Sequence, residues 1–266
     1  MSASDPTFAE RYGPWAIVAG ASEGVGRALA RRIAANGVRC VLVARREQPL
    51  AELAQQIRDE SGVECVLASV DLAKPDAFDR ILAAVGSREV GLYVSNAGAD
   101  PNGAHFLDRK IETWIELSDL NIQTTMRCCH HFGGLMRERR RGGLLLVGSG
   151  AAYGGGPFMA VYSGVKAFDL CFGEGLWAEL RPFGVDVLSL ELVMTDTPAL
   201  HKLLAEKGQS APSRMASPDR VAEVALERLP LGPVYNWGPF ARWRAGWRRT
   251  RVRVVGKLSQ RVFGGG

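Results

Sequence analysis

Several features that define other protein classes are missing from this sequence. No apolar run approaches the ~20 residues that a helix needs to cross a lipid bilayer. The 5 cysteines are odd in number and include no Cys-x-x-Cys pair, which argues against a disulfide scaffold and a dithiol redox motif. The first thirteen residues hold Asp5 and Glu10 and no apolar stretch, so we expect no secretion signal. These absences favour a cytoplasmic chain with reduced thiols.

A metal site is not expected either. Cys128, Cys129, His130 and His131 are consecutive, and their side chains are of the types that bind zinc. Consecutive residues of a helix point in different directions, so these four cannot close one tetrahedral site. We interpret them as packing residues.

The net charge of +5 comes from the C-terminal end of the chain. The segment 239–266 holds 8 of the 33 Lys and Arg residues and no acid, which leaves 25 bases against 28 acids elsewhere. Aromatic residues are interleaved with these bases: Tyr235, Trp237, Phe240, Trp243 and Trp247. This pattern predicts either a clamp on the protein's own body or a second subunit, or a peripheral contact with a membrane surface. No nucleic-acid motif accompanies it, so we expect no nucleic-acid partner.

Short apolar runs alternate with segments of helical periodicity along most of the chain. Strands are predicted at 15–19, 38–43, 65–70, 91–95, 143–147, 185–190 and 232–236, and helices at 24–36, 47–60, 75–84, 112–139, 159–181 and 218–228. This order predicts a single doubly wound Rossmann-type α/β domain, with a parallel seven-stranded sheet and helices on both faces. Ligands of such sheets bind beyond the carboxyl ends of the strands.

A glycine-rich turn follows the first predicted strand. The run 15–19 enters Gly20-Ala21-Ser22-Glu23-Gly24-Val25-Gly26, after which apolar residues recur at helical spacing. Glycines let the backbone approach a ligand closely, and a helix N-terminus presents unpaired N–H groups and a positive dipole end to an anion. The segment predicts a diphosphate cradle, with a plain tight turn as the alternative.

Tyr162 and Lys166 are set four residues apart in a predicted helix. Positions i and i+4 lie on one helix face, so the ammonium can stabilise a phenolate and make the tyrosine an acid or base near neutral pH. Ser149 precedes Tyr162 by thirteen residues and follows a predicted strand. The pair alone is also compatible with an ordinary solvated helix face.

Together these residues resemble the short-chain dehydrogenase/reductase family over about residues 14–200, nearest in look to its hydroxysteroid and ketoacyl reductase branch. Further family landmarks are Asp71, Ser95-Asn96-Ala97-Gly98 in place of Asn-Asn-Ala-Gly, and Asn121. The resemblance implies a family domain at 14–236, after an N-terminal extension 1–13. It also implies a substrate lid near 195–216, followed by the basic aromatic tail 237–266.

The resemblance implies hydride transfer between a nicotinamide and a carbonyl or alcohol carbon. Tyr162 would be the proton donor, and Ser149 would donate a hydrogen bond to the same oxygen. Lys166 would tune Tyr162 and hold the ribose, while Asn121 would hold a water that relays protons. The implied cofactor-binding residues are Gly20, Ser22, Glu23, Gly24, Val25, Gly26, Arg45, Arg46, Asp71, Leu72, Asn96, Ala97, Gly98, Tyr162, Lys166, Thr195 and Thr197.

The choice of cofactor can be argued from charge. NAD sites place an acid about 20 residues beyond the glycine turn, where it binds the ribose 2′-hydroxyl and repels a 2′-phosphate. Here that position is Ala44, followed by Arg45 and Arg46, whose guanidiniums can clasp a phosphate. This favours NADP(H) over NAD(H), although Glu23 in the glycine turn argues the other way.

Three departures from the family pattern affect the cofactor site. Ala19 replaces a threonine whose hydroxyl ties the turn, Ser95 replaces an asparagine, and Leu192-Val193 stands where most members have Pro-Gly. The last change puts the contacts of the following loop, including Thr197, in doubt. None of the three removes a catalytic group.

Two functions of different classes follow. The first is an NADP(H)-dependent oxidoreductase on a hydrophobic carbonyl or alcohol (a steroid, a ketoacyl group or an aromatic ketone), or its NAD(H)-dependent counterpart. The second is a non-catalytic dinucleotide-binding sensor or scaffold, which the complete set of Asn121, Ser149, Tyr162 and Lys166 argues against. The long helices 112–139 and 159–181 are expected to pair with a second subunit, giving a homodimer or homotetramer.

Overall fold

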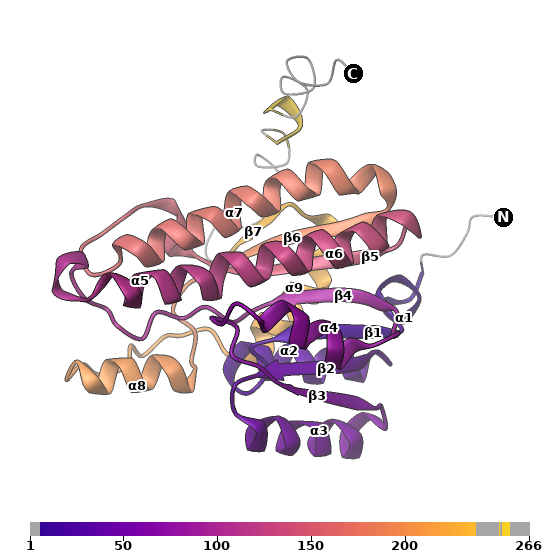
Figure 1. Ribbon diagram of the computed structural model, residues 1–266, viewed down its shortest axis with the longest axis horizontal. Coiled ribbons are helices and arrows are strands. Elements are labelled where there is room, and N and C mark those ends of the chain that lie inside the picture. Colours follow the sequence, from indigo (N-terminus) through magenta and orange to yellow (C-terminus); the bar gives the residue numbers. More distant parts are fainter. Residues whose placement is uncertain (1–5, 238–249, 251, 256–266) are drawn as a thin grey trace.

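The computed structural model describes residues 6–237, 250 and 252–255 of the 266-residue chain. Seven parallel strands form one sheet in the order β3-β2-β1-β4-β5-β6-β7 (Figure 1). The strands are β1 (Trp15–Ala19), β2 (Arg39–Ala44), β3 (Cys65–Ser69), β4 (Val90–Ser95), β5 (Gly142–Ser149), β6 (Val185–Leu192) and β7 (Val234–Asn236). This is the predicted doubly wound Rossmann-type sheet, with the chain reversing its direction of winding between β1 and β4.

Helices cover both faces of the sheet, as the alternation of strand and helix predicts. One face packs against α2 (Gly24–Ala35), α3 (Glu47–Ser61) and α9 (Pro218–Arg228). The other packs against α4 (Ala77–Val85), α6 (Thr124–Glu138) and α7 (Ala160–Leu180). Neighbouring strand residues divide between the two cores, because successive side chains of a strand point to opposite faces. In β1, Ile17 belongs to one core and Val18 to the other.

The predicted continuous helix 112–139 is interrupted, and this is a correction. The structure has α5 (Ile111–Ser118), then a π-helical turn (Asp119–Gln123), then α6. In Figure 1 the three still form one rod beside α7. A π-helical turn widens the helix and loosens its i to i−4 bonding, and such turns are frequent at functional sites.

Two short helices were not predicted. The first, α1 (Phe8–Tyr12), buries Tyr12 and docks on β6 through Asp186, whose carboxylate accepts from the Tyr12 hydroxyl at 2.8 Å and from Arg11 at 2.7 Å. The second, α8 (Pro198–Glu206), lies within the segment interpreted as a lid. Its N-cap, Thr197, accepts the backbone N–H of Leu200 at 3.3 Å.

Part of the C-terminal tail rests on the body of the protein. Val252 is buried, and the guanidinium of Arg253 lies 5.9 Å from the centre of the Trp177 ring on α7. The other Lys and Arg residues counted in segment 239–266, together with three of its aromatic residues, lie outside the described residues: Phe240, Arg242, Trp243, Arg244, Trp247, Arg248, Arg249, Arg251, Lys257 and Arg261. Within the described ranges, no helix is both long and apolar enough to cross a membrane.

Candidate active site

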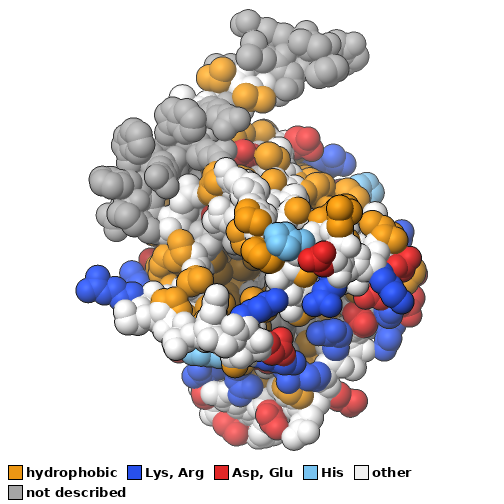
Figure 2. Space-filling view, turned by 90° about the vertical axis from the view of Figure 1, so that its left-hand side faces the viewer, with side chains coloured by type: hydrophobic (Ala, Val, Ile, Leu, Met, Phe, Trp, Pro, Cys, Tyr) orange, Lys and Arg blue, Asp and Glu red, His pale blue; other side chains and the backbone are white. Residues whose placement is uncertain are grey.

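The predicted site residues gather at the carboxyl ends of the strands. Figure 2 looks onto this end of the molecule, which is the left-hand side of Figure 1. Hydrophobic side chains gather over the upper part of this face and around a hollow near its centre, and Lys and Arg side chains gather below. The described residues contain no group of three His, Cys, Asp or Glu side chains placed to hold a metal ion.

The glycine turn after β1 has the geometry of a close-approach cradle. Gly20 and Gly24 have φ angles of +82° and +55°, a backbone region that residues with a Cβ rarely adopt. A Cβ on Gly26 would lie 2.0 Å from the carbonyl oxygen of Gly20, so only glycine fits there. The turn leads into the N-terminus of α2, where the first N–H groups of a helix lack intrahelical partners and can bind an anion.

The glycine turn is held by hydrogen bonds that do not need a hydroxyl at position 19. The backbone N–H groups of Asn96 and Ala97 both donate to the Ala19 carbonyl at 3.1 Å. The side-chain amide of Asn96 donates to the carbonyl of Gly20 at 3.0 Å. The end of β4 therefore holds the glycine turn directly. Ser95, the other substituted position, shares a hydrogen bond of 2.8 Å with the hydroxyl of Thr125 on α6.

The charged residues predicted for the adenosine side make different contacts within the protein. Arg46 donates to Glu23 in an ion pair of 2.5 Å, which joins the start of α3 to the glycine turn. Arg45 is exposed at the end of β2, and none of the described residues forms an ion pair with it. Asp71 accepts the backbone N–H of Ala73 at 3.2 Å, so its carboxylate caps its own turn.

The remaining cofactor candidates lie in the glycine turn and in the loops after β3 and β6. Leu72 is buried, and its carbonyl accepts from the Thr124 hydroxyl at 2.9 Å. A Cβ on Gly24 would lie 3.0 Å from the methyl carbon of Thr197, so this loop reaches the glycine turn despite the change to Leu192-Val193. Thr195 is buried and donates to the carbonyl of Val193 at 3.0 Å, which turns its hydroxyl back into the loop. Ser22 is partly buried, and Val25 belongs to the core.

Asn121 lies in the π-helical turn and is 1% exposed. Its side-chain amide donates to the carbonyl of Leu117 at 2.8 Å, which fixes the orientation of the side chain. Its Oδ1 atom accepts no hydrogen bond from any described residue. A Cβ built on Gly98 would lie 2.1 Å from this Oδ1 and 3.0 Å from the Lys166 Nζ, so both atoms converge on Gly98. The structure thereby brings Asn121 and Lys166 together.

The residues interpreted as proton donor and hydrogen-bond donor flank the same strand end. Ser149 ends β5, and its Oγ accepts the backbone N–H of Ala151 at 3.2 Å. Tyr162 and Lys166 lie one turn apart on α7 and interact electrostatically. The Lys166 Nζ donates to the carbonyl of Val147 at 3.2 Å, two residues before Ser149 on β5. These contacts tie α7 to the end of β5.

Lys166 is 3% exposed and has a buried counter-ion on its own helix. Its Nζ donates to the Asp169 carboxylate at 3.0 Å. Burial disfavours the charge on Lys166, but the charges of Asp169 and Tyr162 outweigh it and raise the pKa of the ammonium above its ordinary value. Burial also raises the pKa of Asp169, and Lys166 partly offsets this. We take the pair as ionised, because each side chain supplies the counter-charge that the other needs.

A second buried acid, Glu191, lies beside these groups and was missed in the sequence. It is 1% exposed and accepts a hydrogen bond of 2.6 Å from the Ser189 hydroxyl. Burial raises its pKa to about 7, against the favourable effects of Ser189, Lys166 and a backbone hydrogen bond from Ser149. The sequence signal was available, because Ser189 and Glu191 continue the inward-facing row of Val185 and Val187 on β6. Polar residues in such a row interrupt an apolar strand face.

Known proteins match this chain along most of its length. The sequence profile of the short chain dehydrogenase family matches residues 14–208. A very-long-chain 3-oxoacyl-CoA reductase from Laccaria bicolor is 33% identical over 237 residues, which cover 87% of this chain and 68% of the relative. A 7β-hydroxysteroid dehydrogenase from Mediterraneibacter gnavus is 31% identical over 225 residues, or 84% of this chain and 85% of that one.

Solved structures of similar proteins also superpose on this chain. A structure of a 7β-hydroxysteroid dehydrogenase superposes with a TM-score of 0.82 at 27% identity, covering 94% of this chain and all of that one. A short-chain dehydrogenase from Sphingobium yanoikuyae in complex with NADPH gives a TM-score of 0.79 at 27% identity, covering 91% and 96%. The chain belongs to the short chain dehydrogenase family. It is an oxidoreductase of that family, which acts on CH–OH and C=O groups.

Proposed function

We propose that the protein is an NADP(H)-dependent oxidoreductase that interconverts a carbonyl and a secondary alcohol on a hydrophobic substrate of the steroid or ketoacyl kind. The observation that carries the proposal is the convergence at Gly98, where Asn121 of the π-helical turn and Lys166 of α7 meet the end of β4. This convergence supports a catalytic role for Asn121 and Lys166 at the edge of the sheet where the glycine turn opens.

The residues of the site support a dinucleotide as cofactor. The left-handed glycines and the N-terminus of α2 suit a diphosphate, and the absence of a side chain at Gly98 lets the Asn121 Oδ1 and the Lys166 Nζ pack against the end of β4. Ala44 puts no carboxylate at the end of β2, and Arg45 beside it is exposed for a 2′-phosphate. The nicotinamide cofactor would supply or accept the hydride. The NADPH complex among the similar structures is in keeping with this choice.

The chain's own groups account for the proton and the developing charge. Tyr162 gives its proton to the alkoxide oxygen during reduction and takes it back during oxidation. Ser149 donates a hydrogen bond to the same oxygen; its Oγ already accepts from Ala151, so the hydroxyl hydrogen remains for the substrate. Lys166 stabilises the Tyr162 phenolate, and the Oδ1 of Asn121 can hold a water that returns protons to Lys166.

The mouth of the site supports a hydrophobic substrate. Three loops at the carboxyl ends of β4, β5 and β6 carry large apolar side chains that remain exposed: Phe106, Leu107, Phe158, Met159, Val193 and Met194. The loops after β4 and β5 touch each other, because the rings of His105 and Phe158 lie 4.1 Å apart. Exposed apolar groups gathered at one mouth mark a binding surface. The names of the relatives fit this surface, since they act on hydroxysteroids and 3-oxoacyl-CoA.

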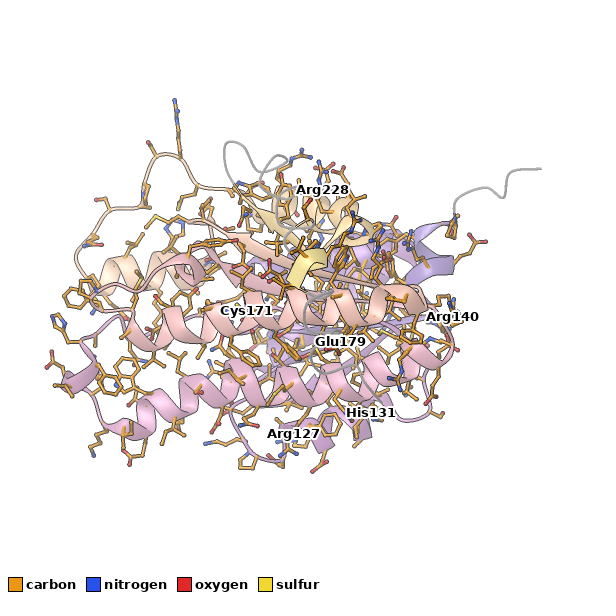
Figure 3. All side chains as sticks on the ribbon, turned by 90° about the horizontal axis from the view of Figure 1, so that it is seen from above. Arg127, His131, Arg140, Cys171, Glu179 and Arg228 are labelled. Atoms are coloured by element: carbon orange, nitrogen blue, oxygen red, sulfur yellow. The ribbon has the colours of Figure 1, made fainter. Side chains whose placement is uncertain are left out.

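A homodimer formed through the long helices is part of the proposal. Figure 3 shows α6 and α7 side by side, with Arg127 and His131 on α6 and Cys171 and Glu179 on α7. The rod of α5 and α6 exposes Ile111, Ile115, Met126 and Leu135. On α7 the rings of Phe168 and Phe172 stack at 5.1 Å. Apolar side chains exposed along neighbouring helices favour pairing with a second copy.

A turnover screen tests the proposal. Ketosteroids and 3-oxoacyl-CoA thioesters would be offered with NADPH and with NADH, and Tyr162→Phe would be assayed on every substrate that is turned over. Loss of the proton donor should lower turnover by a factor of about 100 or more, while the affinity for the dinucleotide, measured by fluorescence titration, stays close to that of the parent. Near-normal turnover by the variant would remove Tyr162 from the mechanism.

A further inference from the structure

Glu191 occupies a space that two glycines open beneath the catalytic centre. A Cβ on Gly148 of β5 would lie 2.4 Å from the Glu191 Oε2, and a Cβ on Gly173 of α7 would lie 3.1 Å from the Ser189 Cβ. Any larger residue at these glycines would push the acid or its hydrogen-bond donor aside. The carboxylate and hydroxyl are therefore built into the interface between β5, β6 and α7.

The neighbours of Glu191 belong to the catalytic site. From α7, the charges of Lys166 and Asp169 act on it, and from β5 the backbone of Ser149 donates to it. From β7, Asn236 lies level with Glu191 in the sheet and accepts a hydrogen bond from the Tyr153 hydroxyl. Tyr235 and its stacked partner Arg228 belong to the opposite face of the sheet. Glu191 thus accepts a hydrogen bond from the backbone of Ser149 and interacts electrostatically with Lys166.

Two carboxylate oxygens of this cluster are left without a donor. Within the part of the chain that the structure describes, neither the Glu191 Oε2 nor the Asp169 Oδ1 accepts a hydrogen bond, and both atoms are shielded from solvent. A buried carboxylate that is incompletely hydrogen-bonded is costly when charged. Asp169 has Lys166 as its ion-pair partner at 3.0 Å, whereas Glu191 has the Ser189 hydroxyl. Glu191 is therefore the member of the cluster that changes protonation near neutral pH, in agreement with its pKa of about 7.

We propose that Glu191 is a positioning residue that acts through Lys166: its protonation state sets how strongly the buried ammonium stabilises the Tyr162 phenolate. This inference rests on the proposed function, because it assigns the proton transfer to Tyr162. When Glu191 is protonated, Asp169 alone opposes the charge of Lys166. When Glu191 is ionised, a second negative charge faces the ammonium and weakens its effect on Tyr162. Tyr162 then becomes the weaker acid, and release of its proton requires a higher pH.

The ionisation of Tyr162 can be followed directly, without a substrate. Tyrosinate absorbs in the near ultraviolet, so a pH titration of the protein minus the same titration of Tyr162→Phe isolates one of the 5 tyrosines. The same difference is then measured in the background of Glu191→Gln. The matched control is Glu179→Gln, which removes the same charge from an exposed position of α7, about 20 Å along the helix from Lys166.

The two variants should differ in this titration. Glu191→Gln removes a negative charge that the parent carries at alkaline pH, so the ionisation midpoint of Tyr162 should fall by about one pH unit. Glu179→Gln should leave the midpoint unchanged, because solvent screens an exposed charge at that distance. An unchanged midpoint in Glu191→Gln, or an equal shift in Glu179→Gln, would overturn the inference. If the amide variant fails to fold by circular dichroism, Glu191→Met removes the same charge and is judged by the same criterion.

Failure of this inference is separable from failure of the proposed function. If Tyr162→Phe is inactive but the ionisation midpoint of Tyr162 is unchanged in Glu191→Gln, Tyr162 remains the proposed acid and base. The positioning role of Glu191 is then wrong. If Tyr162→Phe retains turnover, the acid/base assignment of the proposed function fails, whatever the titration shows, and the role of Glu191 in the reaction fails with it.

Discussion

Glu23 and Arg46 form an ion pair of 2.5 Å that bridges the glycine turn and the start of α3. In the proposed function, the pair lies near the ribose 2′ group of the dinucleotide. Both side chains are substantially exposed, so the pair itself adds little to stability, and a bound 2′-phosphate can compete with Glu23 for Arg46. Arg45 has no such competitor among the described residues. The two arginines should therefore contribute differently to the choice between NADPH and NADH.

Replacement of Arg45 should affect NADPH far more than NADH. Arg45→Ala removes a charge-assisted contact to the 2′-phosphate, so the KM for NADPH should rise about tenfold while that for NADH stays nearly constant. Glu23→Gln should have the opposite effect on NADPH. It removes the carboxylate that pairs with Arg46, so Arg46 can bind the 2′-phosphate, and the KM for NADPH should fall several-fold. Steady-state kinetics with both cofactors checks the pair. Equal effects of Arg45→Ala on the two KM values would show that Arg45 takes no part in cofactor choice.

The buried Glu191 should make stability depend on pH. Its pKa is raised from 4.5 to about 7, so the folded state keeps the proton where the unfolded state has lost it. Its contribution is therefore fully favourable below pH 4.5 and is lost as pH rises to about 7. Glu191→Gln abolishes this loss and should be more stable than the parent by up to about 3 kcal/mol above pH 7. Urea unfolding at pH 5 and pH 8 measures the difference, and a variant that is less stable at pH 8 contradicts the prediction.

Assembly should depend on the exposed apolar side chains of α5 and α6. The parent should have at least the mass of a dimer by light scattering at micromolar concentration. Leu135→Glu places a charge on α6 where a second copy would pack, and should shift the mass toward that of a monomer. Leu107→Glu changes an even more exposed leucine outside these helices, and should leave the mass unchanged. A monomeric parent would contradict the proposed dimer.

The C-terminal tail should stabilise the folded protein. Val252 is buried, and Arg253 lies over Trp177, so removal of residues 238–266 should lower the melting temperature by several degrees. The cut must follow Trp237, because Val234–Asn236 form the edge strand β7. Val252→Ser tests the same contact without a truncation. Salt-sensitive binding of the full chain to anionic liposomes, together with unchanged stability of the truncated form, would instead support a membrane contact.

The sequence alone was enough to predict a doubly wound parallel sheet of seven strands and to propose the residues of its site. Local patterns sufficed for this: apolar runs of strand length, a glycine turn before a helix, and Tyr162 one helical turn from Lys166. The predicted ends of most strands and helices differ from the structure by one or two residues. The first strand, 15–19, coincides with β1. Periodicity carries this information because it reflects which side of an element is buried.

The break in the long helix and the charge pairs around the site could be seen only in the tertiary structure. The π-helical turn that interrupts helix 112–139 coincides with a hydrogen bond from the Asn121 side-chain amide to the carbonyl of Leu117, and helical periodicity does not record such a turn. Glu23 and Arg46 are 23 residues apart, and their meeting requires β1 and β2 to pair. Lys166, Asp169 and Glu191 come together because α7 packs across β5 and β6, with Gly148 and Gly173 making room. Which charges share one buried space is a property of packing, and packing is decided by residues distant in the chain.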